Sequence, residues 1–407
     1  MRGRALFLAA AACALIGTAP HHRLRSAGSF QIDVPAGPYV SGSRLTLNAT
    51  GVQGRVAFSV LGAGTIDGNA FIAPPVAHKT TVTIFGSARG ALAEREIHVV
   101  PPPAPSQALL AVATYRNGIA LHDPRTFHLI GYVPIGGAPG DVAFTPRGGI
   151  VAPDTDGEAM TSISRQPWSV NVIHGVLQGN EIAVDDAGGD IFVSDRDAGG
   201  YGALTRITPQ GEVTRVKTGD TAEGLAIDSG HGIVYVGNVN DESVAEVGAR
   251  SMRVMRKFSS VPRTFGIALD EQAHRLFVVS NTSPSMKERS GYVAAIDLQL
   301  PRPHIGMRSA AMVFPIGVAL DDKRRRLFVT DEVKNAVYVL STKTLRSVHA
   351  PLQTCDTPWR PRSAGGRLYV PCANADKVDV FDLRTLRRVA GAPFATGGFP
   401  LSVALWP

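Results

Sequence analysis

The chain has 407 residues, of which 44% are hydrophobic and 18% charged, a composition that indicates folded domains and excludes a disordered chain. The formal net charge is +7, but residues 1–27 hold four basic residues and no acid, so 37 basic and 34 acidic residues remain in the rest. This balance excludes the strongly basic surface typical of nucleic-acid-binding proteins, and we expect no nucleic-acid partner.

The N-terminus, residues 1–27, has the pattern of a signal peptide. Two arginines precede an apolar stretch, residues 5–17, which suits a signal core and is too short to span a bilayer. Cys13 follows three alanines in a weak resemblance to a lipoprotein box, so a lipid anchor at Cys13 and simple cleavage are alternatives. Both predict an exported protein that is periplasmic, on the cell surface or secreted, and we expect no transmembrane segment after the signal.

Residues 28–100 predict a small β-sandwich. Short, partly alternating β-branched runs are separated by Gly, Pro or Asn, the pattern of half-buried strands. The segments GAGTIDGNAFIAPP and TTVTIFGSARG resemble bacterial immunoglobulin-like repeats, which implies a domain of that type. A Pro-rich linker, residues 101–106, should follow it as an extended segment. The expected strands are 30–34, 44–49, 55–61, 80–85 and 94–100.

Residues 107–407 repeat a unit of about forty residues. Each unit has an apolar strand, a polar turn and a second apolar strand, usually followed by a third and a weaker fourth strand. Four short strands in such a unit are typical of a β-propeller blade. The second unit is the exception, because residues 153–168 lack an apolar third strand. The clearest first strands are centred on Val142, Ile182, Leu225, Ile267 and Val318.

The two ends of this region complete each other. The segment LLAVATY at 109–115 matches a second strand with no first strand before it, and LSVALWP at 401–407 matches a first strand with nothing after it. Pairing them would close the ring with one composite blade. The sequence therefore predicts an all-β chain, an Ig-like sandwich followed by a propeller of seven blades. The predicted second strands begin at 109, 149, 190, 233, 275, 326 and 367.

Two repeats resemble the YVTN family of propellers. They read RLFVTDEVKNAVYVLSTKTL (326–345) and RLYVPCANADKVDVFDLRTL (367–386). The resemblance implies kinship with the propellers of quinoprotein amine dehydrogenases and lactonase-like proteins, but kinship of fold does not transfer function.

Polar residues are expected at one end of the propeller channel, which we call the mouth. It is the end formed by the loops after second strands and before first strands. Ring scaffolds commonly bind a small molecule or a peptide where such groups converge. The candidate ligand-binding residues are Asp141, Glu181, Glu223, Asp195, Asn238, Asn281, Asp331 and Trp359.

Three of these acids come from consecutive blades, and two interpretations of them remain open. Calcium or another divalent cation prefers several oxygen ligands, and Asp141, Glu181, Glu223 and Asn238 are the candidate metal ligands. Similarity to gluconolactonase-like propellers, which hold a divalent ion at the mouth, favours this view. In the other interpretation the acids pair with Arg116, Arg196, Arg263, Arg360 or Arg362, cap turns, or meet only water.

Two cysteines, Cys355 and Cys372, remain after the signal, and an even number in an exported chain favours a disulfide. Both fall in mouth-side loops of one blade, which makes the bridge geometrically plausible.

No hydrolase, zinc-protease or phosphate-loop motif is present in the sequence. We therefore expect a non-catalytic binding or scaffold protein of the cell envelope. The alternative is a divalent-metal-dependent lactonase-type hydrolase, and a weaker third reading is a redox propeller subunit.

Overall fold

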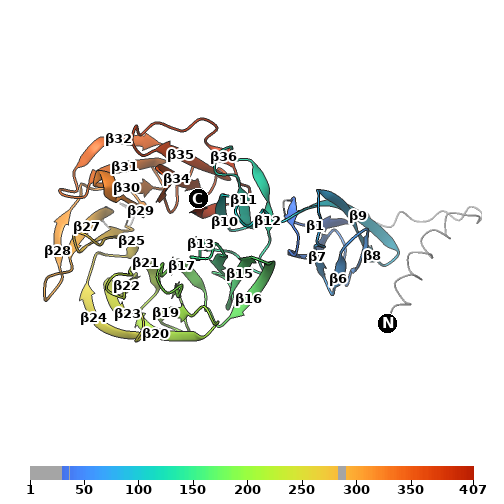
Figure 1. Cartoon of the computed structure of the whole chain (residues 1–407), viewed down its shortest axis with the longest axis horizontal. Coiled ribbons are helices and arrows are strands. Elements are labelled where there is room, and N and C mark those ends of the chain that lie inside the picture. Colours follow the sequence, from blue (N-terminus) through green and yellow to red (C-terminus); the bar gives the residue numbers. More distant parts are fainter. Residues whose placement is uncertain (1–29, 36, 283–289) are drawn as a thin grey trace, which may run out of the picture.

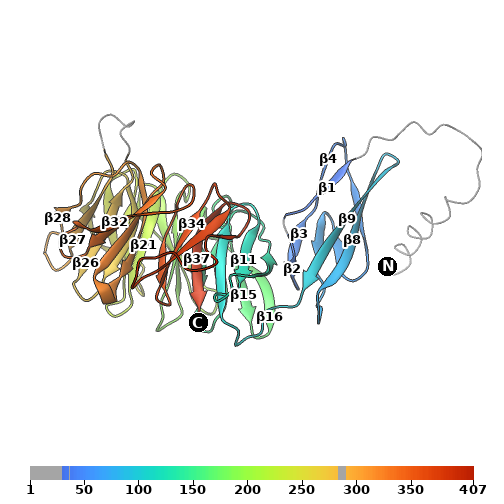
Figure 2. The ribbon, with the colours of Figure 1, turned by 90° about the horizontal axis from the view of Figure 1, so that it is seen from above.

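The computed structural model describes residues 30–35, 37–282 and 290–407. A small β unit lies beside a ring of blades, with the ring seen face-on in Figure 1 and from its side in Figure 2. The predicted signal peptide and Cys13 lie outside the described residues.

The N-terminal unit is built from several short sheets packed on a shared core. One sheet has the order β2-β9-β8-β5, a second has the order β3-β7-β6, and β1 pairs with β4. Leu45, Phe71, Ile84 and Val99 are fully buried between them, which is the alternation expected of a sandwich. The strands are β1 (Gln31–Asp33), β2 (Tyr39–Val40), β3 (Arg44–Thr46), β4 (Asn48–Thr50), β5 (Ala57–Leu61), β6 (Thr65–Asp67), β7 (Ala70–Ile72), β8 (Thr80–Ala88) and β9 (Ala91–Val100).

The five predicted strands of this unit are present, but three others were missed. The predicted strand 44–49 is divided into β3 and β4, and β2, β6 and β7 have no counterpart in the prediction. Each of these three strands has only two or three residues, too few to show an alternating pattern.

The sandwich is joined to the propeller by a continuous sheet. Strand β2 pairs in parallel with β9 on one side and with β12 (Leu129–Val133) of the first blade on the other. Side chains reinforce this contact, since the Trp168 indole N–H donates to the Ser41 carbonyl oxygen at 2.7 Å. A terminal guanidinium nitrogen of Arg165 donates to the carbonyl oxygens of Ala104 at 2.8 Å and of Gln107 at 2.7 Å. The Pro-rich segment is therefore one of several connections between the two parts.

Seven blades of four antiparallel strands surround the channel, as predicted (Figure 1); six are separate sheets, and the composite blade is part of the eight-stranded sheet that continues into the sandwich. The composite blade contains β37 (Pro400–Trp406), β10 (Leu109–Thr114), β11 (Gly118–His122) and β12. The second blade contains β13 (Ala143–Phe144), β14 (Ile150–Pro153), β15 (Ala159–Arg165) and β16 (Trp168–His174). The third contains β17 (Gly179–Val184), β18 (Ile191–Asp195), β19 (Gly202–Ile207) and β20 (Val213–Gly219). The fourth contains β21 (Ala222–Asp228), β22 (Ile233–Asn238), β23 (Ser243–Gly248) and β24 (Arg253–Ser259). The fifth blade contains β25 (Thr264–Asp270), β26 (Arg275–Ser280), β27 (Tyr292–Asp297) and β28 (Ile305–Arg308). The sixth contains β29 (Pro315–Asp321), β30 (Arg326–Asp331), β31 (Ala336–Ser341) and β32 (Ser347–Gln353). The seventh contains β33 (Arg362–Ala364), β34 (Arg367–Cys372), β35 (Lys377–Asp382) and β36 (Phe394–Ala395).

Burial falls from the middle of each blade to its rim. The second strands β18 and β34 are buried along almost their whole length, because neighbouring blades cover both of their faces. The outer strands β24 and β32 are mostly exposed and carry polar residues. This gradient explains why second strands are the clearest in the sequence and fourth strands the weakest.

The second blade has a third strand although its sequence lacks the apolar pattern. Residues 159–165 form a regular third strand, β15, although their sequence is largely polar. Met160 and Ile163 fill the core of the blade, and Arg165 is buried against the segment that leads in from the sandwich. Contacts outside the blade thus replace the missing apolar pattern.

The ring closes as predicted. Strand β37 pairs antiparallel with β10 from Leu109↔Trp406 to Thr114↔Pro400, so the last residues supply the inner strand of the first blade. First strands of neighbouring blades pack closely around the channel. A Cβ at Gly224 would lie 2.0 Å from the Phe265 carbonyl oxygen, which permits only glycine there. Within the described residues, no helix is long and apolar enough to cross a membrane.

Candidate functional site

The mouth of the propeller contains a cavity of about 370 Å³. The loops before first strands and after second strands form its walls. The loops predicted at the mouth therefore do meet there. Aromatic rings and charged groups are mixed on its surface. The lining residues are Tyr115, Thr155, Asp156, Asn180, Arg196, Glu223, Arg263, Phe265, Asn281, Phe314, Ile316, Glu332, Trp359, Arg360, Phe399 and Leu401.

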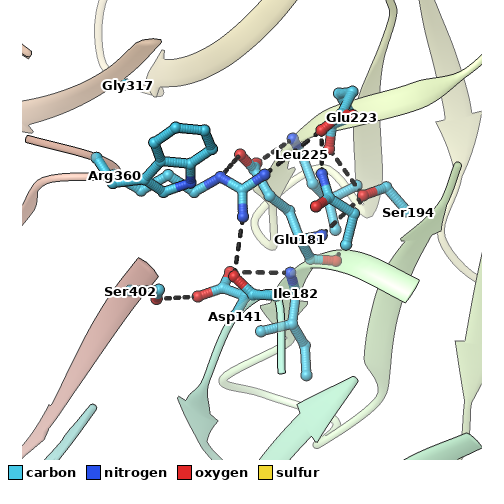
Figure 3. Close-up of polar contacts among 12 residues, drawn as sticks. Asp141, Glu181, Ile182, Ser194, Glu223, Leu225, Gly317, Arg360 and Ser402 are labelled. Atoms are coloured by element: carbon cyan, nitrogen blue, oxygen red, sulfur yellow. Dashed lines mark hydrogen bonds and ion pairs between the residues drawn. The ribbon is translucent and has the colours of Figure 1, made fainter. Parts of the chain in front are cut away.

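Arg360 sits at the floor of this cavity and links several blades. Its Nε lies 2.9 Å from a carboxylate oxygen of Glu181, and one terminal nitrogen lies 3.4 Å from a carboxylate oxygen of Glu223. The other terminal nitrogen donates to the carbonyl oxygen of Gly140 at 2.9 Å (Figure 3). A guanidinium suits this place, because it is planar, stays charged and presents several donors in fixed directions.

Glu181 and Glu223 each reach a neighbouring blade. A Glu181 carboxylate oxygen accepts the backbone N–H of Leu225 at 2.9 Å. Glu223 lies 2.6 Å from Nε of Arg196 and also accepts the side-chain amide of Asn180. The buried charges are thereby paired and hydrogen-bonded, which is the condition under which a folded protein tolerates them.

Asp141 completes this layer on the side of the closing strand. It accepts the backbone N–H of Ile182 at 3.1 Å and the hydroxyl of Ser402 (Figure 3). Arg362 lies 3.8 Å from the same carboxylate. We call Asp141, Glu181, Glu223 and Arg360 the ionic layer.

Desolvation has the largest influence on the pKa values of Glu181 and Glu223 in the ionic layer. Burial raises the pKa of Glu181 to about 7; the charge of Arg360 opposes this effect, and Asp141 and Glu223 add to it. The pKa of Glu223 is also raised by burial, although Arg196 and Arg360 act in the opposite direction. Glu181 therefore titrates near neutral pH, where an ordinary glutamate is fully ionised.

The predicted mouth residues fall into three groups. Glu223, Asn281 and Trp359 line the cavity, and Asp141 and Glu181 belong to the ionic layer. The remaining three were predicted at the mouth, but their side chains bond within their own blade, to the loop that leads into it or, for Asn238, also to the outer strand β20 of the preceding blade. Asp195 accepts from Thr205 and Arg215, Asn238 bonds to Thr218 and Ser243, and Asp331 accepts backbone N–H groups of Val313 and Lys334.

The predicted metal ligands do not fit a divalent cation. The Asn238 amide bonds to Thr218 and Ser243 rather than facing the carboxylates, so it cannot complete a shell with them. Glu181 and Glu223 already engage the guanidinium of Arg360, which stands where a shared cation would have to bind. Over the described ranges, no cluster of three or more His, Cys, Asp or Glu side chains is arranged to hold a metal. The acids do pair with arginines, namely Arg196, Arg360 and Arg362, whereas Arg116 and Arg263 form no ion pair with them in the part of the chain that the structure describes.

The disulfide between Cys355 and Cys372 is confirmed. It ties the loop before β33, which carries Trp359 and Arg360, to the end of β34. A bridge that closes a loop of this size stabilises the fold by about 3 kcal/mol on the chain-entropy model.

Sequence reasoning missed two partners in the site. Asn180, next to Glu181, bonds to Glu223 of the following blade, and Ser402 of the closing strand bonds to Asp141. The repeat alignment placed both residues beside first strands, but alignment alone does not show which neighbouring strand a side chain faces.

Comparison with solved structures supports the fold. No protein-family model and no curated protein matches the sequence. A putative 6-phosphogluconolactonase from Bacteroides fragilis is 12% identical with a TM-score of 0.59, over 75% of this chain and 100% of that one. A functionally unknown protein from Desulfotomaculum acetoxidans is 14% identical with a TM-score of 0.58, over 73% and 99%. Kuenenia stuttgartiensis hydrazine synthase is 14% identical with a TM-score of 0.57, over 76% and 92%. At these identities the likeness concerns the fold alone, and by fold this chain is a β-propeller protein.

Proposed function

We propose that this chain is a non-catalytic binding protein of the cell envelope whose propeller holds a small ligand in the mouth cavity. The observation that carries the proposal is the ionic layer beneath the cavity. Its carboxylates are engaged by arginines, so they brace the ring and leave the aromatic and polar groups above them for binding. Mixed walls of this kind, apolar with a few placed polar groups, are typical of small-molecule sites.

The finer assignments belong to the same proposal. The two repeats at 326–345 and 367–386 support a YVTN-type propeller, and the strand pattern of the sandwich supports a bacterial Ig-like domain. The N-terminal sequence supports export, with cleavage or lipidation at Cys13 as alternatives. The sandwich, which shares a sheet with the first blade, would hold the propeller in a fixed orientation to the envelope.

A ligand screen with matched channel variants tests this function. Thermal-shift screening of the mature chain against sugars, peptides and lactones should identify ligands, whose affinity is then measured by calorimetry. Phe265 lines the mouth, whereas Phe144 lines the opposite end of the channel. Phe265→Leu should weaken binding up to about tenfold through lost ring contacts, and Phe144→Leu should leave the affinity unchanged.

The alternative function, a metal-dependent lactonase-type hydrolase, predicts a different result. A stoichiometric divalent ion in the purified protein that is lost in Glu181→Gln, together with lactone hydrolysis, would replace the binding proposal. Absence of any ligand, or binding that responds to Phe144→Leu rather than Phe265→Leu, would reject the mouth as the site.

A further inference from the structure

The arginines of the mouth differ in how far their charges are compensated. Arg360 and Arg196 are committed to Glu181 and Glu223 by ion pairs of 2.6 to 3.4 Å. Arg263 also lines the cavity, but within the described residues it forms no ion pair with an acid. Its Nε donates to the carbonyl oxygen of Asn281 at 3.0 Å. That bond holds the guanidinium in place and leaves its two terminal nitrogens available.

A free guanidinium edge is suited to a carboxylate. Its parallel N–H groups match the two oxygens of a carboxylate, and such charge-assisted pairs are about twice as strong as neutral hydrogen bonds.

The acids of the cavity differ in the same way. Glu223 is paired with two arginines, and Asp156 accepts the hydroxyl of Tyr115 at 2.8 Å. Glu332 also lines the cavity, and within the described ranges no basic side chain lies in ion-pair contact with it. Burial raises the pKa of Glu332, and the nearby Asp331 and Asp356 raise it further. The cavity thus presents one base without an ion pair, Arg263, whose charge still acts on Glu223, and two acids without an ion pair, Asp156 and Glu332, within the described residues. Of these, Arg263 and Glu332 are linked through the residues between them.

These two groups stand on adjacent blades. Arg263 precedes β25, and Glu332 follows β30 of the next blade. A chain of contacts joins them, because Asn281 accepts from Arg263 and donates to the carbonyl oxygen of Pro315, while Glu332 donates its backbone N–H to Phe314. The rings of Phe265, Phe314 and Phe399, with Tyr115, form the remaining apolar wall. Tyr115 and Phe399 pack edge to face with centroids 6.2 Å apart.

We infer that the mouth binds a small zwitterion of the amino-acid class, such as a free aromatic amino acid or a very short peptide with an aromatic side chain. Its carboxylate pairs with Arg263, its ammonium group pairs with Glu332, and its ring packs on the phenylalanines. A cavity of about 370 Å³ accommodates a ligand of this size. The inference rests on the proposed function, since it names the ligand class of the same site.

Three probes with the same phenyl ring separate the contribution of the carboxylate from that of the ammonium group. Phenylalanine carries both charges, 3-phenylpropionate carries only the carboxylate, and phenethylamine carries only the ammonium group. Calorimetry on the mature chain should show phenylalanine binding at least tenfold more tightly than either of the others. Each charged contact is expected to be worth about that factor.

Two variants with matched controls assign the charges. Arg263→Gln should weaken phenylalanine and 3-phenylpropionate by at least about tenfold and leave phenethylamine unchanged. Glu332→Gln should weaken phenylalanine and phenethylamine and spare 3-phenylpropionate. The controls Arg384→Gln and Glu212→Gln alter exposed residues away from the mouth and should have no effect.

The outcomes separate this inference from the proposed function. If the three probes bind equally, or if Arg263→Gln and Glu332→Gln leave their affinities unchanged, the zwitterion is rejected. If none of them binds while other ligands bind in a manner sensitive to Phe265→Leu, the mouth remains a binding site and only the ligand class is wrong. If no ligand of any class binds, both proposals fail.

Discussion

The two halves of the propeller channel are built from the same strands but have opposite chemistry. At the mouth end, Glu181 and Glu223 pair with Arg360, and Asp141 lies near Arg362, in a layer of buried acids. Toward the other end, a cavity of about 470 Å³ is lined mainly by aliphatic residues such as Val142, Ile182 and Leu225. A shift of one or two residues along a first strand therefore separates a charged environment from an apolar one.

The two halves of the channel differ in how closely their side chains follow the repeat. The apolar half follows the repeat, because every first strand contributes similar side chains to it. The charged half departs from the repeat, because each blade contributes a different acid, base or amide. The proposed binding site lies in the charged half, where loops rather than stacked strands supply the side chains.

Removal of the closing strand should have the largest effect, because β37 contributes to both halves. Ser402 bonds to Asp141 at the mouth end, while Ala404 and Leu405 line the lower cavity. Deletion of residues 401–407 should abolish cooperative unfolding as measured by circular dichroism, since β10 would lose its inner partner β37 along its whole length and keep only β11. Deletion of Pro407 alone, which follows the strand, is the control. A truncated chain that melts like the intact one would refute ring closure.

Loss of Arg360 should have the second-largest effect on stability, because it affects only the charged half of the channel. Arg360→Met leaves Glu181 and Glu223 buried with fewer partners, and breaking a buried ion pair costs about 3–5 kcal/mol. The free energy of unfolding, measured with denaturant, should fall by that amount, whereas the exposed control Arg387→Met should change it by less than about 0.5 kcal/mol. Adding Glu181→Gln to Arg360→Met should restore part of the loss. Equal stability of the Arg360 and Arg387 variants would show that the layer contributes nothing.

The pH dependence of stability should give the smallest effect of the three. Because burial raises the pKa of Glu181 from 4.5 to about 7, the folded state binds a proton that the unfolded state releases. The free energy of unfolding should therefore decrease as pH rises from about 4.5 to 7, by at most about 3 kcal/mol from this group. The raised pKa of Asp195, about 6, acts in the same direction.

A variant isolates the contribution of Glu181. Glu181→Gln should flatten the decline between pH 4.5 and 7, and Glu212→Gln, at an exposed turn, should leave it unchanged. If wild type and Glu181→Gln lose stability in parallel, Glu181 is ionised like an ordinary surface glutamate, and the comparison between the two halves would need revision.

Much of the fold was predictable because its signals are local. The second strands are buried on both faces, so their apolar runs stand out in the sequence, and all seven were placed to within one residue of their observed starts. Ring closure followed from two unmatched half-blades, and the disulfide followed from the only two cysteines left after the signal. Strands of two or three residues, such as β2, carry no periodicity and were missed.

The amino-acid sequence by itself determined the repeat, the number of blades, the joining of the chain ends and the set of polar residues beside the channel. Only the tertiary structure decided which of those residues meet. Arg360 reaches Gly140, 220 positions earlier in the chain, because the ring returns the last blades to the first. Asp195, Asn238 and Asp331 share a position in the repeat with mouth residues, yet their side chains bond elsewhere. Asp195 bonds within its own blade, Asn238 reaches Thr218 of the preceding blade, and Asp331 bonds to the loop before β29. Side-chain direction depends on contacts between distant segments, and a one-dimensional pattern does not encode them.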